Sequence, residues 1–237
     1  MNKYWLLISN FSRFLKWRKK LNDTQNDMFK PTSFDFNLEQ NFEKKEKAFK
    51  EQFEIGFVKS EQNLLLISST LKECDKKNLR DNRVIWNAAN YIIILSYDLK
   101  VATYSLIKEK RQWNKLYFAR QLCLILYECS KNIPHINGKE FQQVLKKLKE
   151  SDKISNHINN VVKEISKYYY DNKDFLFEVR NTATAHRDFK DTLNQLRTIN
   201  TIEIEKVLKI SHQFEELINE LGGAIQKALN AASNELK

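Results

Sequence analysis

The chain has 237 residues, of which 42% are hydrophobic and 30% are charged, and its formal net charge is +10. This apolar content excludes a wholly disordered chain, and the length suits one main domain with a sizeable core. Only four Gly and two Pro interrupt it, so turns are few and the elements are long. The composition therefore predicts an all-α protein.

The positive charge is concentrated at the N-terminus. Residues 1–22 hold six Lys or Arg and no acidic residue, which leaves +4 for the rest of the chain. Apolar side chains recur there at helical spacing, at Tyr4, Leu7, Ile8, Phe11, Phe14 and Leu15. Three interpretations stay open: a helix packed on the core or on a partner, an arm that contacts nucleic acid, and a helix lying in a membrane interface.

A polar stretch with Pro31 as a breaker separates this segment from a long, highly charged helix. The apolar positions of that helix begin at Leu38 and resume at Leu64. The pattern is typical of an extension and not of a second catalytic domain. We therefore assign residues 1–78 to a basic N-terminal helix and a helical extension.

From Arg80 onward the apolar pattern thickens, as expected of core helices. Amphipathic segments follow one another at residues 84–102, 116–127, 141–148, 154–169 and 204–229. Pro134 and Gly138 predict a break after the second segment. Asp171 or Asn172 is expected to cap the helical segment that carries residues 177–188. Thr201 is expected to start the last helix. We predict an up-and-down helical bundle over about residues 80–232, in a domain of residues 79–237.

The cysteines and the hydropathy limit the classes of protein. Cys74, Cys123 and Cys129 are odd in number, have no CxxC spacing and accompany no clustered histidines, so neither disulfides nor a structural zinc site is expected. We expect no metal and no cofactor. A reducing cytoplasm fits this usage best, and no apolar run is long enough to predict a transmembrane segment.

Side chains suited to phosphate chemistry lie close together only in residues 177–188. Arg180 offers a planar guanidinium fork that suits a phosphate, and His186 an imidazole that exchanges protons near neutral pH. Cleaving RNA without a metal needs such a cation and such a base, which together give a 2′,3′-cyclic phosphate and a 5′-hydroxyl. Asn181 either binds a phosphate oxygen or fixes the tautomer of His186.

The same residues resemble a known motif. Arg180 and Asn181, followed by His186 in a helical bundle with a further long helix, resemble the Arg-x(4–6)-His motif of the HEPN superfamily. The string from Ala185 to Asp188 is similar to that of its abortive-infection and toxin-like members. The likeness covers about residues 80–232, and only the short motif is diagnostic.

The resemblance implies a function. It implies a metal-independent endoribonuclease of toxin or anti-phage type, with tRNA, mRNA or rRNA as target and an antitoxin or defence-system protein as a possible partner. The catalytic candidates are Arg180 and His186, and the substrate-binding candidates are Asn181, Thr184 and Arg187. The alternative is a non-catalytic HEPN-like scaffold or a regulatory, nucleotide-binding partner in such a system.

The spacing of the motif imposes a geometric condition. On an ideal helix, six residues turn through about 600°, which places Arg180 and His186 roughly 120° apart. Either the helix loosens before His186, or two copies form a composite site across a two-fold axis, and we favour the homodimer. In the competing interpretation Arg180 is an exposed cation paired with Glu178 or Asp174, while Asp98 and Glu128 are solvated edges of core helices.

Overall fold

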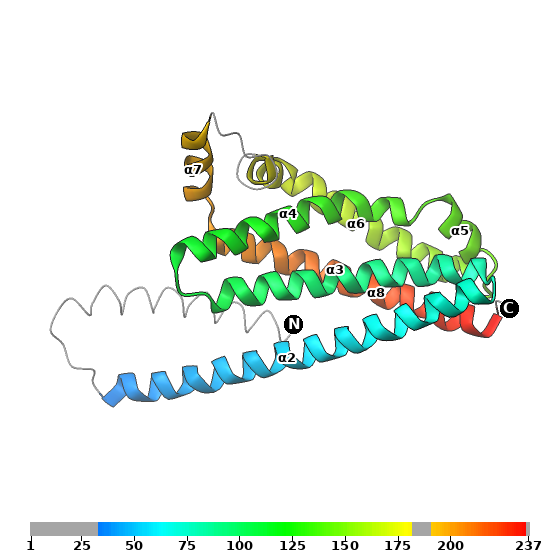
Figure 1. Ribbon diagram of the computed structural model, residues 1–237, viewed down its shortest axis with the longest axis horizontal. Helices are drawn as coiled ribbons and strands as arrows, with labels where there is room; N and C mark the ends of the chain where they lie inside the picture. The colour runs from blue at the N-terminus through cyan, green and yellow to red at the C-terminus, as the bar shows by residue number, and fades with distance from the viewer. Residues whose placement is uncertain (1–32, 182–190, 236–237) are drawn as a thin grey trace. The chain divides into compact units, whose positions relative to one another are not determined.

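The computed structural model describes residues 33–181 and 191–235, and every regular element in this part of the chain is helical. The predicted all-α helical bundle is confirmed (Figure 1). The proposed basic helix in residues 1–22 lies outside the described residues. The helices are α2 (Ser33–Lys76), α3 (Arg80–Lys108), α4 (Gln112–Ile136), α5 (Lys139–Leu145), α6 (Ser151–Glu178), α7 (Thr192–Asn200) and α8 (Ile204–Glu235).

Contacts divide the chain into two units, residues 1–56 and residues 57–237, so the division falls within α2. Of the first unit the structure describes only the beginning of α2. The second unit contains the rest of α2 and all later helices. The predicted boundary after residue 78 falls at the turn between α2 and α3, where Asn78 has a φ of 55°.

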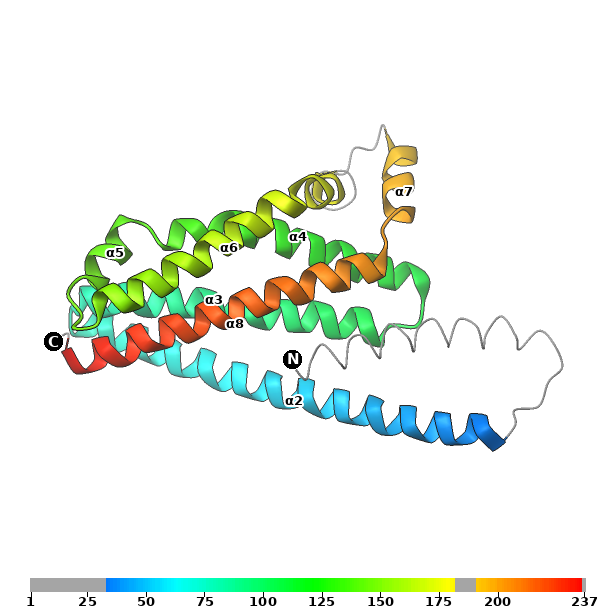
Figure 2. The ribbon, with the colours of Figure 1, turned by 180° about the vertical axis from the view of Figure 1, so that it is seen from behind.

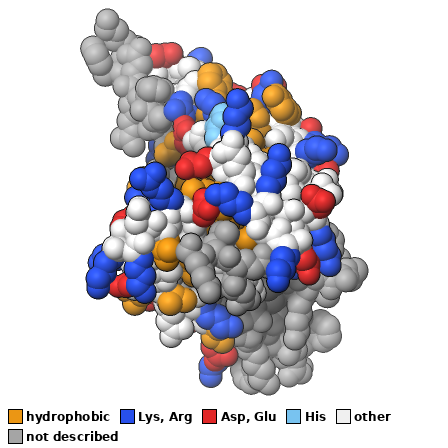
Figure 3. Space-filling view, turned by 90° about the vertical axis from the view of Figure 1, so that its right-hand side faces the viewer, with side chains coloured by type: hydrophobic (Ala, Val, Ile, Leu, Met, Phe, Trp, Pro, Cys, Tyr) orange, Lys and Arg blue, Asp and Glu red, His pale blue; other side chains and the backbone are white. Residues whose placement is uncertain are grey.

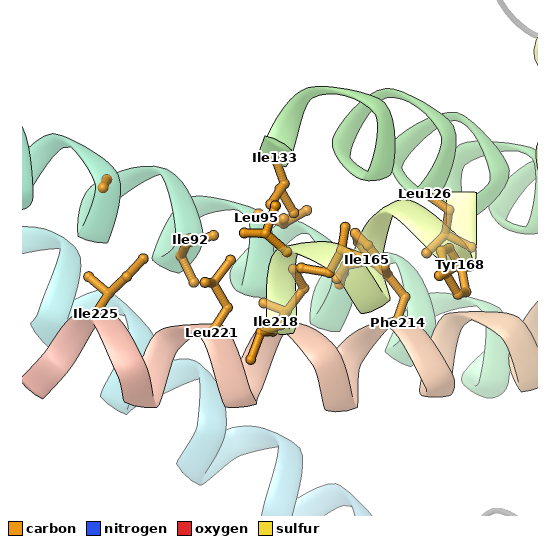
Figure 4. Close-up of a cluster of buried hydrophobic side chains, with 14 of the residues drawn as sticks. Ile92, Leu95, Leu126, Ile133, Ile165, Tyr168, Phe214, Ile218, Leu221 and Ile225 are labelled. Atoms are coloured by element: carbon orange, nitrogen blue, oxygen red, sulfur yellow. The ribbon is translucent and has the colours of Figure 1, made fainter. Parts of the chain in front are cut away.

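Four long helices of the second unit, α3, α4, α6 and α8, share one core, because each buries an apolar face against the others (Figure 2). Ile92 and Leu95 of α3 meet Leu221 and Ile218 of α8 there (Figure 4). α5 lies at one end of this bundle and α7 at the other. Burial of these side chains is the main source of stability of the unit.

One aromatic contact inside the core also carries a polar group. The ring of Tyr168 lies 5.0 Å from that of Phe214, which is fully buried. The Tyr168 hydroxyl donates to the backbone oxygen of Ile210 at 3.1 Å, and burial raises its pKa. The hydrogen bond compensates for the loss of water around a buried hydroxyl and ties α6 to α8.

The second half of α2 packs against α3. The ring of Phe57 lies 5.8 Å from that of Tyr97 and 5.7 Å from that of Tyr104. Lys100 donates to the hydroxyl of the buried Ser60 at 3.2 Å, and burial lowers the pKa of this lysine.

Among the described residues, no helix combines the length and apolarity needed to cross a bilayer.

Three details differ from the sequence predictions. Thr201, the predicted start of the last helix, is the C-cap of α7, and α8 begins at Ile204. α6 runs without interruption through Asp171 and Asn172, so the predicted cap there is wrong. The helix continues because buried Leu176 extends its apolar face beyond these residues. The side chain of Asn172 donates to the backbone oxygen of Tyr168 at 2.9 Å within the helix. The short helix α7 was not predicted; its N-cap Asp191 accepts a hydrogen bond from the backbone of Asn194 at 3.3 Å.

The buried thiol of Cys123 in α4 predicts a pH dependence. Burial raises its pKa from an ordinary value near 9 to about 12, so the folded chain holds a proton that the unfolded chain releases above pH 9. This contribution to stability is complete below pH 9 and is lost as the pH rises towards 12, with a slope of at most about 1.4 kcal/mol per pH unit. We expect urea unfolding of Cys123→Ala to depend less steeply on pH above 9 than that of wild type, whereas the exposed control Leu65→Ala keeps the wild-type slope. Equal slopes for Cys123→Ala and wild type would contradict the assignment.

Candidate active site

The candidate site forms where α6 ends. Beyond Glu178 the helix widens into a π-helical turn over residues 179–181. Leu176 and Val179, both buried, hold this end of α6 on the core. Such wide turns are rare and are frequent at functional sites. The turn positions Arg180 and Asn181, two of the residues that the sequence singled out.

Arg180 is fixed by three contacts. Its Nε donates to Oε1 of Glu128 at 2.5 Å, and its Nη1 donates to Oδ1 of Asn181 at 2.6 Å. The centre of its guanidinium lies 5.3 Å from the centre of the Tyr127 ring. The side chain is 25% exposed, so solvent reaches it, but its orientation is set by a carboxylate, an amide and a ring.

Glu128 is a residue of the site whose role was not predicted from the sequence. It lies on α4, 52 positions before Arg180, and was expected to be a solvated edge. The expected partners of Arg180 on its own helix, Glu178 and Asp174, are not the ones that orient it. The sequence does contain a sign of this role: Glu128 is the one carboxylate among the apolar positions of this core helix. A carboxylate in such a place indicates a partner on another helix.

Two neutral groups lie beside Glu128. Burial raises the pKa of Cys129 to about 11 and that of Tyr91 well above its ordinary range. Both are therefore uncharged at neutral pH, and Cys129 is no thiolate nucleophile. The charges of this part of the site come from Glu128 and Arg180.

The described residues include only the first part of the motif. Thr184, His186 and Arg187 lie outside the described residues, as does Asp188. The structure thus brings Arg180 and Asn181 together and adds Glu128 and Tyr127 to them.

The opposite end of the bundle has a different character. A hollow of about 530 Å³ lies between the start of α6 and the end of α8, lined in part by Lys149, Lys153, His157 and Lys227. The face of the molecule that carries α5 shows Lys and Arg side chains interspersed with acidic and uncharged ones (Figure 3). Within residues 33–181 and 191–235, no three His, Cys, Asp or Glu side chains form a group able to hold a metal ion.

No protein-family model, curated protein or solved structure matches this chain.

The pairing of Glu128 with Arg180 predicts a measurable coupling. Because the pair is partly shielded from water and hydrogen-bonded, we expect a double-mutant cycle with Glu128→Gln and Arg180→Gln to give a coupling of about 0.5–1.5 kcal/mol in urea unfolding. The exposed pair Lys77 and Glu73, 3.5 Å apart, serves as control and is expected to give less than about 0.5 kcal/mol. A coupling for Glu128 and Arg180 no larger than that of the control would show that the carboxylate does not fix the guanidinium.

Proposed function

We propose that this protein is a metal-independent endoribonuclease of the toxin or abortive-infection type, acting on cellular RNA. The observation that supports it best is the preorganised guanidinium of Arg180, which belongs to an Arg-x(4–6)-His motif and is still open to solvent. A guanidinium that is held in place needs little reorganisation when charge develops on a phosphate.

In the proposed reaction, His186 removes the proton from a 2′-hydroxyl, and the resulting oxygen attacks the adjacent phosphorus. The P–O5′ bond breaks and the leaving oxygen takes a proton, which yields a 2′,3′-cyclic phosphate and a 5′-hydroxyl. Arg180 stabilises the negative charge of the pentacoordinate transition state through N–H groups other than those that donate to Glu128 and Asn181. Asn181 fixes the orientation of the guanidinium through the bond to Nη1, while Thr184 and Arg187 contact the RNA backbone.

Glu128 has a dual effect in this proposal. Its negative charge offsets part of the attraction between Arg180 and a phosphate, which weakens binding of the ground state. It also restricts the guanidinium to one orientation, so fewer conformations are lost when the transition state forms. Glu128 is thus a positioning residue and does not itself contact the RNA.

The nuclease activity is tested with purified protein and RNA in excess EDTA. We expect cleavage products that end in a 2′,3′-cyclic phosphate, and no cleavage when the attacking 2′-hydroxyl is replaced by hydrogen. Arg180→Ala and His186→Ala should each lower the rate by about 100-fold or more, because they remove charge stabilisation and proton transfer. The exposed Arg197 of α7 provides the control, and Arg197→Ala should cleave like wild type. A full rate for His186→Ala would overturn the proposal.

We further propose that two copies build the site together across a two-fold axis, the homodimer that the sequence favours. The expected particle has twice the chain mass of 28.3 kDa in sedimentation experiments. If each site uses both copies, cleavage per chain should fall when the protein is diluted below the concentration at which dimers persist. If activity per chain stays constant while dilution dissociates the dimer, each site is formed by one protomer and the composite site is refuted.

The contact between Arg180 and Glu128 also favours a second candidate function. An ion pair that joins α6 to α4 is what a purely structural arginine would form, as in a non-catalytic scaffold or regulatory partner of the same superfamily. For such a protein, Arg180→Ala and His186→Ala would leave the biological effect intact. Growth arrest on expression of wild type, absent with His186→Ala, would decide for the nuclease.

A further inference from the structure

Four aromatic rings form a connected group next to Arg180, which we call the aromatic strip: Tyr127 of α4 and Tyr169, Tyr170 and Phe177 of α6. The ring centre of Tyr127 lies 5.8 Å from that of Tyr169 and 5.9 Å from that of Phe177. The rings of Tyr169 and Tyr170 are 5.5 Å apart. The strip therefore extends from the guanidinium of Arg180 back along α6, where α4 and α6 lie side by side (Figures 1 and 2).

The strip is open to solvent at its outer members. Tyr170 is 66% exposed and Phe177 is 50% exposed, whereas Tyr127 is buried and forms the floor. Large exposed aromatic side chains in a continuous group are unusual on a surface without a binding role. The strip thus combines a buried ring, Tyr127, with rings that solvent can reach, Tyr170 and Phe177.

Cations accompany the rings. Lys131 lies 5.8 Å from the centre of the Tyr127 ring, and Lys173 lies 5.4 Å from that of Tyr170. With Arg180 on the face of Tyr127, three positive charges contact the strip. One acid also borders the rings, because Asp174 lies four residues after Tyr170 and three before Phe177 on α6, whereas Asp171 and Glu178 are turned roughly 80–120° away from these two rings on an ideal helix.

The alternation of rings and cations identifies the ligand class. Single-stranded nucleic acid presents unstacked base faces, which stack on aromatic rings, and phosphates at regular intervals, which pair with Lys and Arg. A duplex hides its base faces inside its own stack. An apolar protein surface would have to remove three cations from water without replacing their hydration, which is costly.

We propose that the aromatic strip binds single-stranded RNA by base stacking and leads the strand to Arg180, so that the substrate of the nuclease is unpaired RNA. The proposal rests on the proposed nuclease function and adds the substrate class to it. Lys131 and Lys173 hold the phosphates between the stacked bases.

The test measures binding separately from cleavage. A short fluorescent 2′-O-methyl oligoribonucleotide lacks the attacking hydroxyl, so its anisotropy reports binding alone. The double variant Tyr170→Leu with Phe177→Leu keeps apolar side chains but removes both exposed rings. Because each stacked base contributes a factor of about 5 to 150 in affinity, we expect this variant to bind about tenfold more weakly or worse. Tyr170→Trp with Phe177→Trp should bind within a few-fold of wild type.

Matched controls are available on α2, where Leu65 and Leu66 are 73% and 58% exposed. The double variant Leu65→Ala with Leu66→Ala should bind like wild type. Replacing Lys173 by Gln should reduce the slope of log affinity against log salt by about 0.7, as expected for one lost phosphate contact on a single strand.

Several results would overturn the strip as an RNA site: wild-type affinity in the double Leu variant, equal binding of a duplex of the same sequence, or no binding of any single strand to wild type. Altered self-association of the double Leu variant with unchanged oligonucleotide binding would assign the strip to a protein contact instead. Normal cleavage by wild type together with normal binding by the double Leu variant would refute the strip alone. Ring-dependent binding without cleavage of any RNA would refute the nuclease alone.

Discussion

The contact between α4 and the end of α6 is the constraint on which the candidate site depends. α6 buries an apolar face down to Leu176 and Val179, so its last turns stay on the core. That packing brings Arg180 to the one stretch of α4 that offers both a ring and a carboxylate, in Tyr127 and Glu128. A helix that ended at Asp171 or Asn172 would have left the motif segment without this support.

Tyr127 connects structure and chemistry. Its ring is buried in the bundle, yet it contacts Arg180, Tyr169 and Phe177, so one side chain sets the position of the cation and of the aromatic strip together. Aromatic rings lose little conformational freedom on packing, and their faces attract cations. The buried ring of Tyr127 therefore supports both the proposed catalytic cation and the proposed substrate platform.

The electrostatics of the site balance positioning against attraction. Glu128 neutralises much of the charge of Arg180 at short range, while the neutral neighbours Cys129 and Tyr91 add none. The positive charge next to the strip then comes chiefly from Lys131 and Lys173, which are further from the motif. In the proposed function, these lysines attract the strand and Arg180 acts mainly on the transition state.

The sequence by itself determined the helical class, the order of the core helices along the chain and the motif around Arg180, because helical periodicity and local composition are properties of neighbouring residues. It did not determine the continuity of α6. Asp171 and Asn172 favour a helix cap, but burial of the apolar face continues the helix through them. It also missed α7, whose nine residues are fewer than the window of about 11–18 residues over which helical periodicity is recognised. Only the tertiary structure decided that Glu128, 52 positions away, orients Arg180, and that rings from α4 and α6 form one strip. Such pairings depend on how two helices pack, and no local pattern in the chain encodes which side chains will meet.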